Sequence, residues 1–219
     1  MFSFASATMD MQYNDKQIQI MEAAEKLFAD RGFSGTSVRD IAEAASVNLA
    51  MISYYFGSKD KLMQAMFLHR GEFMKMQLES ILHNREMTSF QKVERMVDEY
   101  IERLFQKQFF HKVMLREQMM ITAGPIAEQI LQLKQTNQAL FKQIILEGQK
   151  KGEFKKGIDI QFLMLTLVGT ASQLIATQHY YREANNLQSL SREEFEKQIK
   201  KKLGAYLKNL FKAILSYES

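Results

Sequence analysis

Proline is nearly absent from this chain, and that scarcity limits its possible folds more than any other feature of the sequence. The 219 residues contain one proline, the residue that ends or kinks helices because it lacks a backbone N–H and clashes with the preceding turn. Several glycines fall between segments in which apolar residues recur at helical spacing. Alternating runs of β-branched residues, which are typical of strands, are missing. We therefore predict an all-α protein of about nine helices.

Composition narrows the class of protein further. Hydrophobic residues make up 46% of the chain and charged residues 25%, the usual mixture for a globular protein. Cysteine is absent, which excludes a disulfide framework, a thiolate metal site and a cysteine nucleophile. Residues 1–11 lack the pattern of a secretory signal, and polar residues interrupt the most apolar window, residues 158–176. We expect a cytoplasmic protein with no membrane partner.

Capping residues predict where the first helices begin and end. Asn14 and Gln17 make a capping box for a first helix, which stops at Gly32. A second, short helix begins at Ser37, and a third begins at Asn48. The predicted helices of this part span residues 15–31, 37–45, 48–56 and 58–82. Longer amphipathic helices follow, and the last two span residues 158–180 and 192–215.

The second and third helices have the apolar spacing of a helix-turn-helix. Ala42 is small where the two helices cross, and Val47 and Ile52 hold the second helix of the pair against the first. In this motif the second helix lies in the DNA major groove, with its N-terminal residues facing the base edges. Many helical hairpins share the spacing, so a plain three-helix packing unit is the alternative at this point.

Residues after the motif favour a nucleic-acid partner. Tyr54 and Tyr55 offer hydroxyls to phosphate oxygens if they are exposed. Lys59 falls in the first turn of the next helix, where the macrodipole disfavours a cation by about 0.3–1 kcal/mol. A DNA phosphate bound at that terminus would reverse the sign of this effect. The alternative is a solvated lysine beside Asp60.

Three blocks of the sequence occur in a familiar order and spacing. They are AAEKLFADRGF at residues 23–33, TSVRDIA at residues 36–42 and YYFGSKDKL at residues 54–62. Together they resemble the tetracycline-repressor (TetR) family of bacterial transcription regulators over about residues 15–65. The rest of the chain resembles the family in helix number and apolarity.

The resemblance implies a homodimer that binds a near-palindromic DNA operator and is released by a small-molecule effector. It implies a flexible segment at residues 1–13, a DNA-binding domain at 14–60, and a ligand-binding and dimerisation domain at 61–219. Arg39 is expected to read guanine or to clamp a phosphate. The full set that the resemblance places at DNA is Thr36, Ser37, Val38, Arg39, Asn48, Leu49, Ala50, Ser53, Tyr54, Tyr55 and Lys59.

Two residues and the local charge depart from this pattern. Ser46 stands where the family usually has glycine, and Ser53 replaces a residue that is commonly aromatic. Residues 1–75 carry eight basic and nine acidic side chains, a net charge of −1, so a strongly basic DNA footprint is absent. The alternative function is therefore a small-molecule binding or sequestering protein whose helix-turn-helix no longer reads DNA. An enzyme is not expected, because no catalytic or glycine-rich phosphate motif is present.

Methionine and phenylalanine are concentrated in the part that would bind an effector. Nine of the fifteen methionines lie between residues 63 and 120, and methionine adapts to irregular apolar ligands as well as to plain cores. Glu117 falls near an apolar stripe, where it would balance a cationic or hydrogen-bonding ligand or pair with Arg95, Arg103 or Arg116. We expect an apolar or amphipathic effector, no cofactor and no metal ion. The candidate pocket residues are Met66, Phe105, Phe110, His111, Met114, Glu117 and Met164.

The helix predicted at residues 158–180 is apolar nearly all round, which predicts burial on more than one side. With the last helix it would form a four-helix bundle across a two-fold axis, the dimer arrangement of the family. The alternative is packing within one chain. The candidate interface residues are Phe162, Gly169, Gln173, Tyr206, Leu210 and Phe211.

Overall fold

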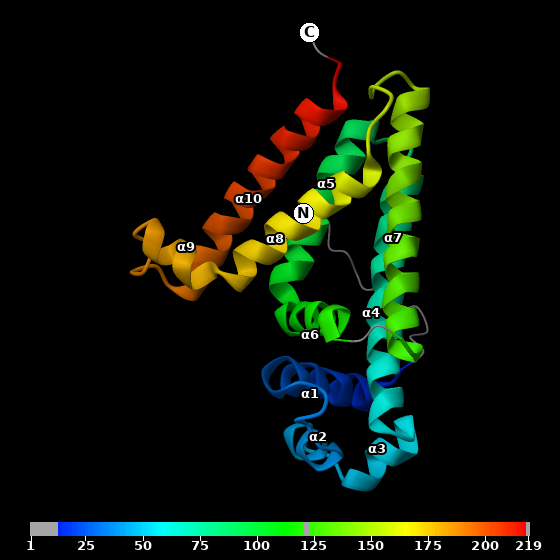
Figure 1. Ribbon diagram of the computed structural model, residues 1–219, viewed down its shortest axis with the longest axis vertical. Coiled ribbons are helices and arrows are strands. Elements are labelled where there is room, and N and C mark those ends of the chain that lie inside the picture. Colours follow the sequence, from blue (N-terminus) through cyan, green and yellow to red (C-terminus); the bar gives the residue numbers. More distant parts are fainter. Residues whose placement is uncertain (1–12, 121–122, 218–219) are drawn as a thin grey trace. The chain divides into compact units, whose positions relative to one another are not determined.

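The structure, a computed structural model, describes residues 13–120 and 123–217, and its regular elements within these ranges are all α-helices (Figure 1). The predicted fold class is confirmed. The helices are α1 (Asp15–Arg31), α2 (Val38–Ala44), α3 (Leu49–Phe56), α4 (Lys59–His83), α5 (Ser89–Gln106), α6 (Gln108–Met120), α7 (Pro125–Lys150), α8 (Ile160–Ala176), α9 (Gln178–Ala184) and α10 (Arg192–Leu215).

The described chain has one helix more than the nine we predicted, because the helix expected at residues 158–180 is broken. Thr177 ends α8 and precedes α9, and the two helices are bent by 76°. The Thr177 hydroxyl donates to the carbonyl oxygen of Gln173 at 2.8 Å. Neither proline nor glycine lies at the bend, so no local stop signal revealed it.

The chain forms two compact units, which we describe separately. Unit 1 is the chain up to Glu72 together with Lys112–Ile130, and unit 2 comprises Phe73–His111 and the chain from Leu131 onward. Helices α4, α6 and α7 each contribute to both units. The division at residue 60 that the family resemblance implies stays a prediction.

Unit 1 is held together by an apolar centre and one buried ion pair. Ile20 of α1, Ile41 of α2 and Ile52 of α3 have no exposed surface. The Arg70 guanidinium of α4 donates to both carboxylate oxygens of the buried Glu25 on α1, at 2.6 and 3.1 Å. This fork-to-fork geometry fixes the direction of α4 relative to α1, because both partners lose their freedom to rotate.

In unit 2 the large apolar core lies where α5, α8 and α10 pack against one another (Figure 1). Each of the three helices contributes fully buried residues, such as Val97 on α5, Ala171 on α8 and Leu207 on α10. Phe211 belongs to the same core and is only 1% exposed. Its prediction as a dimer contact is therefore wrong, because its side chain faces its own chain.

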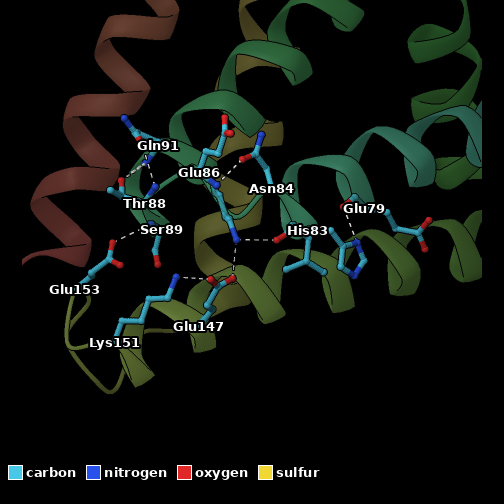
Figure 2. Close-up of polar contacts among 12 residues, drawn as sticks. Glu79, His83, Asn84, Glu86, Thr88, Ser89, Gln91, Glu147, Lys151 and Glu153 are labelled. Carbon is cyan, nitrogen blue, oxygen red and sulfur yellow. Dashed lines mark hydrogen bonds and ion pairs between the residues drawn. The ribbon is translucent and has the colours of Figure 1, made fainter.

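A polar network closes the junction between α4 and α5 in unit 2 (Figure 2). Thr88 and Gln91 form the capping box of α5, and the backbone N–H of Ser89 donates to Glu153 at 2.8 Å. The buried ammonium of Lys92 donates to Glu147 at 2.9 Å and to the carbonyl oxygen of Leu82 at 2.7 Å. Hydrogen bonds from Lys151 and Lys92 lower the pKa of the Glu147 carboxyl group. The network ties the start of α5 to the end of α7 and the turn after it, and the buried Ser89 hydroxyl has no hydrogen-bond partner among the described residues.

Two expectations concern the ends of the chain and the membrane. Residues 1–12 of the predicted flexible segment lie outside the described residues. Tyr13 packs its ring edge-on against His69, with ring centres 5.7 Å apart. Within the described ranges no single helix is long and apolar enough to cross a membrane, and α8 with α9 passes that test only as a bent pair.

Candidate functional site

The start of α2 is fixed by a reciprocal cap between Ser37 and Asp40. The Ser37 hydroxyl accepts from the backbone N–H of Asp40 at 3.1 Å and donates to the Asp40 carboxylate at 2.5 Å. The same carboxylate accepts from the backbone N–H of Ser37 at 2.8 Å. These bonds, together with the nearby Arg31, lower the pKa of Asp40. The cap sets the direction of α2 and leaves the Ser37 hydroxyl engaged within the protein.

The turn between α2 and α3 has the geometry of a Schellman motif. Ser46 lies in the left-handed region with φ of 50°, and the backbone N–H of Val47 donates to the carbonyl oxygen of Ala42 at 2.9 Å. The Gln19 side chain of α1 donates to the carbonyl oxygen of Ala45 at 2.9 Å. A left-handed serine costs about 1–2 kcal/mol. The turn therefore keeps the family geometry at Ser46 without the usual glycine.

Helix α3 has one buried side and one side that is exposed to solvent. Its N-cap is Asn48, whose side-chain oxygen accepts from the backbone N–H of Ala50 at 2.9 Å. Ile52 and Phe56 are buried. Tyr54, on the side opposite Ile52, is 83% accessible to solvent, and Leu49, in the first turn, is 42% accessible. Such exposed apolar and aromatic side chains on an eight-residue helix need a partner surface to be useful.

The remaining α3 candidates share this open side. Ala50 and Ser53 are exposed, and Tyr55 is half-buried. The rings of Tyr54 and Tyr55 lie 5.2 Å apart in an edge-on arrangement. Each hydroxyl sits at the end of a side chain whose ring is already oriented, which suits a contact to a phosphate oxygen.

The structure bears on the predicted DNA contacts of Thr36 and Lys59. Thr36 is 1% exposed, and its hydroxyl donates to the carbonyl oxygen of Gly32 at 2.8 Å. Its side chain is therefore not available to DNA. The Lys59 ammonium donates to the carbonyl oxygens of Phe33 and Thr36, at 2.8 Å each, and lies 4.2 Å from the centre of the Phe33 ring. Two of its three N–H donors thus hold the loop between α1 and α2.

Arg39 is the free cation of this surface. It lies exposed on α2 and makes no hydrogen bond or ion pair with the described residues. Val38, beside it, is half-buried. An unpaired guanidinium next to the open side of α3 suits two-pronged recognition of a guanine edge or a phosphate.

Comparison with known proteins agrees with this geometry. Residues 20–66 match the family model described as bacterial regulatory proteins of the tetR family. Residues 86–183 match the model described as a tetracyclin repressor-like C-terminal domain. The two models together cover more than half of the chain. The chain belongs to the TetR family. The proteins that these comparisons name are regulators of transcription and not enzymes.

Individual TetR-family proteins show how far the likeness extends. The chain is 33% identical over 139 residues to the probable HTH-type transcriptional regulator YttP of Bacillus subtilis, covering 62% of this chain and 66% of that protein. The matched region therefore spans slightly less than two thirds of that relative.

Solved structures extend the likeness of fold to nearly the whole chain. The ketosteroid transcriptional regulator KstR2 of Mycobacterium tuberculosis has a TM-score of 0.72 at 16% identity, over 95% of this chain and 98% of that one. The regulator FadR of Bacillus subtilis, solved in complex with stearoyl-CoA, has a TM-score of 0.63 at 19% identity, over 87% and 96% of the chains.

The predicted effector residues of this TetR-family chain are divided between the two units. Met66, Met114 and Glu117 belong to unit 1, and Met66 is fully buried there. Glu117 is 5% exposed and has no ion pair with the described residues. Burial raises the pKa of its carboxyl group, and the nearby Arg116 partly opposes that shift.

Phe105, Phe110, His111 and Met164 belong to unit 2. Phe105, Phe110 and His111 are buried, whereas Met164 is half-buried against the core. The ring of Phe110 lies 6.1 Å from that of His111. In this unit the structure therefore brings the predicted His111 into an aromatic setting.

Sequence reasoning missed the polar neighbours of His111. The ring of Tyr100 on α5 lies 6.0 Å from the His111 ring, and its hydroxyl bonds to Ser172 on α8. Burial raises the pKa of Tyr100 to about 12. Arg103, one turn further along α5, bonds to the side-chain oxygen of Gln77 on α4. The sequence suggests Arg103 only as one of three partners for Glu117, which falls near an apolar stripe.

Several hydrogen-bonding atoms of this cluster have no partner. The Nε and Nη1 atoms of Arg103 and the Nε2 atom of His111 are buried without a hydrogen bond to the described residues. Burial and the Arg103 charge lower the pKa of His111 to about 4. Leaving such a donor buried and unsatisfied costs about 1–3 kcal/mol, and native proteins leave few of them. The cluster is a feature that needs an explanation.

The exposed side of α8 carries the predicted dimer contacts. Phe162 is 68% exposed, and Leu165, three residues on, is 63% exposed. Gly169 and Gln173 continue the same side and are exposed. On α10, Tyr206 is exposed and Leu210 half-buried. A depression of about 230 Å³ next to Phe162 is lined by residues including Thr166 and Ile214. None of the predicted effector residues lines it.

Proposed function

We propose that this chain is a homodimeric repressor that binds a near-palindromic operator with α3 and is released by an apolar or amphipathic effector. The open side of α3, with the free Arg39 beside it, is the observation that carries the proposal. In a dimer the two α3 helices would read successive major grooves, about 34–36 Å apart along the DNA. A repressor-like C-terminal domain supports the direction of regulation.

The contacts divide into base reading and backbone binding. Arg39 reads guanine or clamps a phosphate, and Leu49 and Ala50 contact thymine methyl groups. Asn48, the N-cap of α3, and the exposed Ser53 face the bases. Tyr54 and Tyr55 bind the sugar–phosphate backbone, and Lys59 contributes its remaining N–H donor. Few of these groups are charged, so we expect a shallow dependence of affinity on salt.

Selection from random duplex DNA, followed by gel-shift titration, tests the DNA proposal. Wild-type protein is expected to enrich one palindrome. Arg39→Ala is expected to weaken binding to it by about 1–3 kcal/mol, the typical value of a two-pronged base contact. Arg85→Ala is the matched control, because Arg85 is also exposed but lies in the loop between α4 and α5. Failure to enrich any palindrome would favour the alternative, a protein that only binds or sequesters small molecules.

We place the dimer interface on the exposed side of α8 and the adjoining part of α10. Phe162, Leu165 and Val168 together expose a continuous apolar strip, and monomers rarely leave such strips in water. Gly169, with nothing within 4 Å of its position for a side chain, permits a helix of the second copy to approach closely. The depression beside Phe162 gives an apolar side chain of that copy a place to insert.

Sedimentation equilibrium tests the interface. Wild-type protein is expected to have the mass of two chains at micromolar concentration, and Leu165→Glu that of one, because a charge would be buried without a partner. Leu146→Glu is the control, since Leu146 is exposed on α7 away from this strip. A dimeric Leu165→Glu variant would place the interface elsewhere.

The effector site that we propose lies in unit 2, among the residues around His111. Phe105, Phe110, His111 and Met164 supply apolar and aromatic surface, which suits an apolar or amphipathic molecule. FadR, which shares the fold, was solved with stearoyl-CoA, an amphipathic molecule. An effector that prefers a conformation with altered spacing of the two α3 helices would release DNA through its differential affinity.

A further inference from the structure

Polar atoms without partners gather at one place in unit 2, where α4, α5, α6 and α8 each contribute a residue. Arg103 carries two buried donors that nothing satisfies, and His111 carries a third such atom. Tyr100 interacts with both residues: its ring lies edge-on to the His111 ring, and the Arg103 charge acts on its hydroxyl. No ion pair with the described residues neutralises Arg103. The carboxylate of Glu99 is 2.6 Å from Arg95 instead.

The chemistry of these atoms specifies one sign of charge. A guanidinium has only donors and cannot lose its proton in a protein. The Nε2 atom of a neutral imidazole donates when it carries the proton, and burial together with the neighbouring Arg103 charge keeps His111 neutral. A group that accepts several hydrogen bonds and carries negative charge satisfies all of these atoms at once, whereas an ammonium group satisfies none of the Arg103 donors.

Apolar surface adjoins the polar atoms. The Phe73 ring lies 6.0 Å from the central guanidinium carbon of Arg103, and the Phe110 ring adjoins His111. Asn137 on α7 donates to the sulfur of Met74 and leaves its own side-chain oxygen without a partner. A molecule held by its anionic end at Arg103 would find aromatic and thioether side chains along the rest of its length.

We propose that unit 2 binds an amphipathic anion, with its oxyanion held by the Arg103 guanidinium and by the Nε2 atom of His111. The shared chemistry is a carboxylate or a phosphate monoester on an apolar body. The proposal rests on the proposed effector site and specifies the charge of its ligand. It replaces the cationic ligand that Glu117 suggested from the sequence, because Arg103 gives this cluster a positive charge.

Isothermal titration calorimetry with four ten-carbon amphiphiles at pH 7.5 tests the proposal. Decanoate, decyl phosphate, decanol and decylamine share one apolar tail and differ in the head group. Wild-type protein is expected to bind at least one of the two anions about tenfold or more tighter than decanol and decylamine, since hydrogen bonds to charged groups are strong. The better anion distinguishes a carboxylate from a phosphate. Equal binding of all four, tighter binding of decylamine, or no binding of either anion overturns the proposal.

Variants assign the effect to the cluster. Arg103→Gln is expected to reduce anion affinity about tenfold or more and to leave decanol binding unchanged. Arg192→Gln removes the same charge from an exposed position on α10 and is expected to change nothing. If Arg103→Gln does not fold, His111→Gln is expected to weaken anion binding several-fold. Anion binding at wild-type strength in a folded Arg103→Gln or His111→Gln protein overturns the proposal.

DNA is absent from these titrations, so the two proposals fail separately. A protein that selects a palindrome but binds neither anion retains the operator proposal and loses this one. A protein that binds an anion through Arg103 but selects no palindrome retains this proposal as a property of unit 2.

Discussion

The helix-turn-helix of unit 1 and the interior of unit 2 use their polar side chains in opposite ways. Around the turn, polar groups serve the backbone: Ser37 and Asn48 cap helices, and Lys59 bonds to two loop carbonyls. In unit 2, the half-buried Arg103 and the buried His111 have buried hydrogen-bonding atoms that no described residue satisfies. The caps and loop contacts around the turn are therefore satisfied within the chain itself, whereas the buried polar atoms of Arg103 and His111 are not satisfied by the described residues.

The difference follows from where each partner binds. DNA meets a surface, where water satisfies polar groups until the duplex replaces it. A surface of this kind can therefore be rigid before binding, and its caps make it so. A molecule bound in an interior meets groups that water does not reach. Those groups stay unsatisfied until the molecule arrives, which makes the unliganded state less stable and gives the ligand its affinity.

The largest expected effect tests how tightly the apolar core of unit 2 is packed. Phe211→Ala is expected to lower the free energy of unfolding by about 3–5 kcal/mol, because it leaves a cavity in a packed core. Urea denaturation measures this as a lower midpoint at unchanged slope. A loss below about 1 kcal/mol would mean that this core is loosely packed.

Tyr206→Ala is the matched comparison for Phe211→Ala. Both residues lie on α10 and both were predicted to contact a second copy, but Tyr206 is 57% exposed. The variant is expected to weaken the dimer and to change the stability of the single chain little. Sedimentation at several concentrations separates the two effects. The reverse pattern would restore Phe211 to the interface.

A smaller effect on stability is expected from the titration of His111, which belongs to the cluster with unsatisfied polar atoms. The pKa of His111 is lowered to about 4 in the folded protein, against about 6.5 for an unfolded histidine. Because the unfolded chain binds the proton more readily, this contribution to stability is present above about pH 6.5 and is lost as the pH falls towards 4. Between pH 7 and pH 5 the expected loss is about 2 kcal/mol.

Comparison with His111→Gln isolates that loss from all other titrating groups. Urea midpoints at pH 7 and pH 5 are measured for both proteins, and the wild type is expected to lose about 2 kcal/mol more than the variant. Parallel losses would show that His111 is already solvated or paired, and the contrast between the two regions would then weaken.

The same contrast explains which features the sequence predicted. Caps and turns act between near neighbours in the chain, so the boxes at Asn14 and Ser37 and the start of α3 at Asn48 were predicted correctly. Helical periodicity also placed most of the longer helices. It did not reveal the bend at Thr177, where the sequence has neither proline nor glycine.

The cluster of unit 2 depends on contacts between residues far apart in the chain. Gln77 and Arg103 meet across 26 positions, and Ser172 joins Tyr100 from α8. No local pattern contains that information, so the sequence offered Arg103 only as a candidate partner of Glu117. The prediction that Phe211 contacts a second copy was wrong for a related reason. Helical spacing shows that a residue faces an apolar neighbour, but it does not show whether that neighbour belongs to the same chain.

The smallest expected effect tests whether the turn of the helix-turn-helix carries a cost of its own. Ser46 and Asn186 occupy the same place in two Schellman motifs, with φ of 50° and 55°. In each motif the next residue donates to a carbonyl five positions back, Val47 to Ala42 and Leu187 to Arg182. The two positions therefore differ mainly in side chain, and asparagine tolerates this conformation better than serine.

Ser46→Gly is expected to raise the free energy of unfolding by about 0.5–1 kcal/mol, because relief of the left-handed strain exceeds the added entropy of the unfolded glycine. Asn186→Gly is expected to change it by less, since less strain is present to relieve. Urea midpoints of both variants measure the difference. An equal gain at both positions would mean that Ser46 is not specially strained. The turn of the helix-turn-helix would then carry no backbone cost of its own.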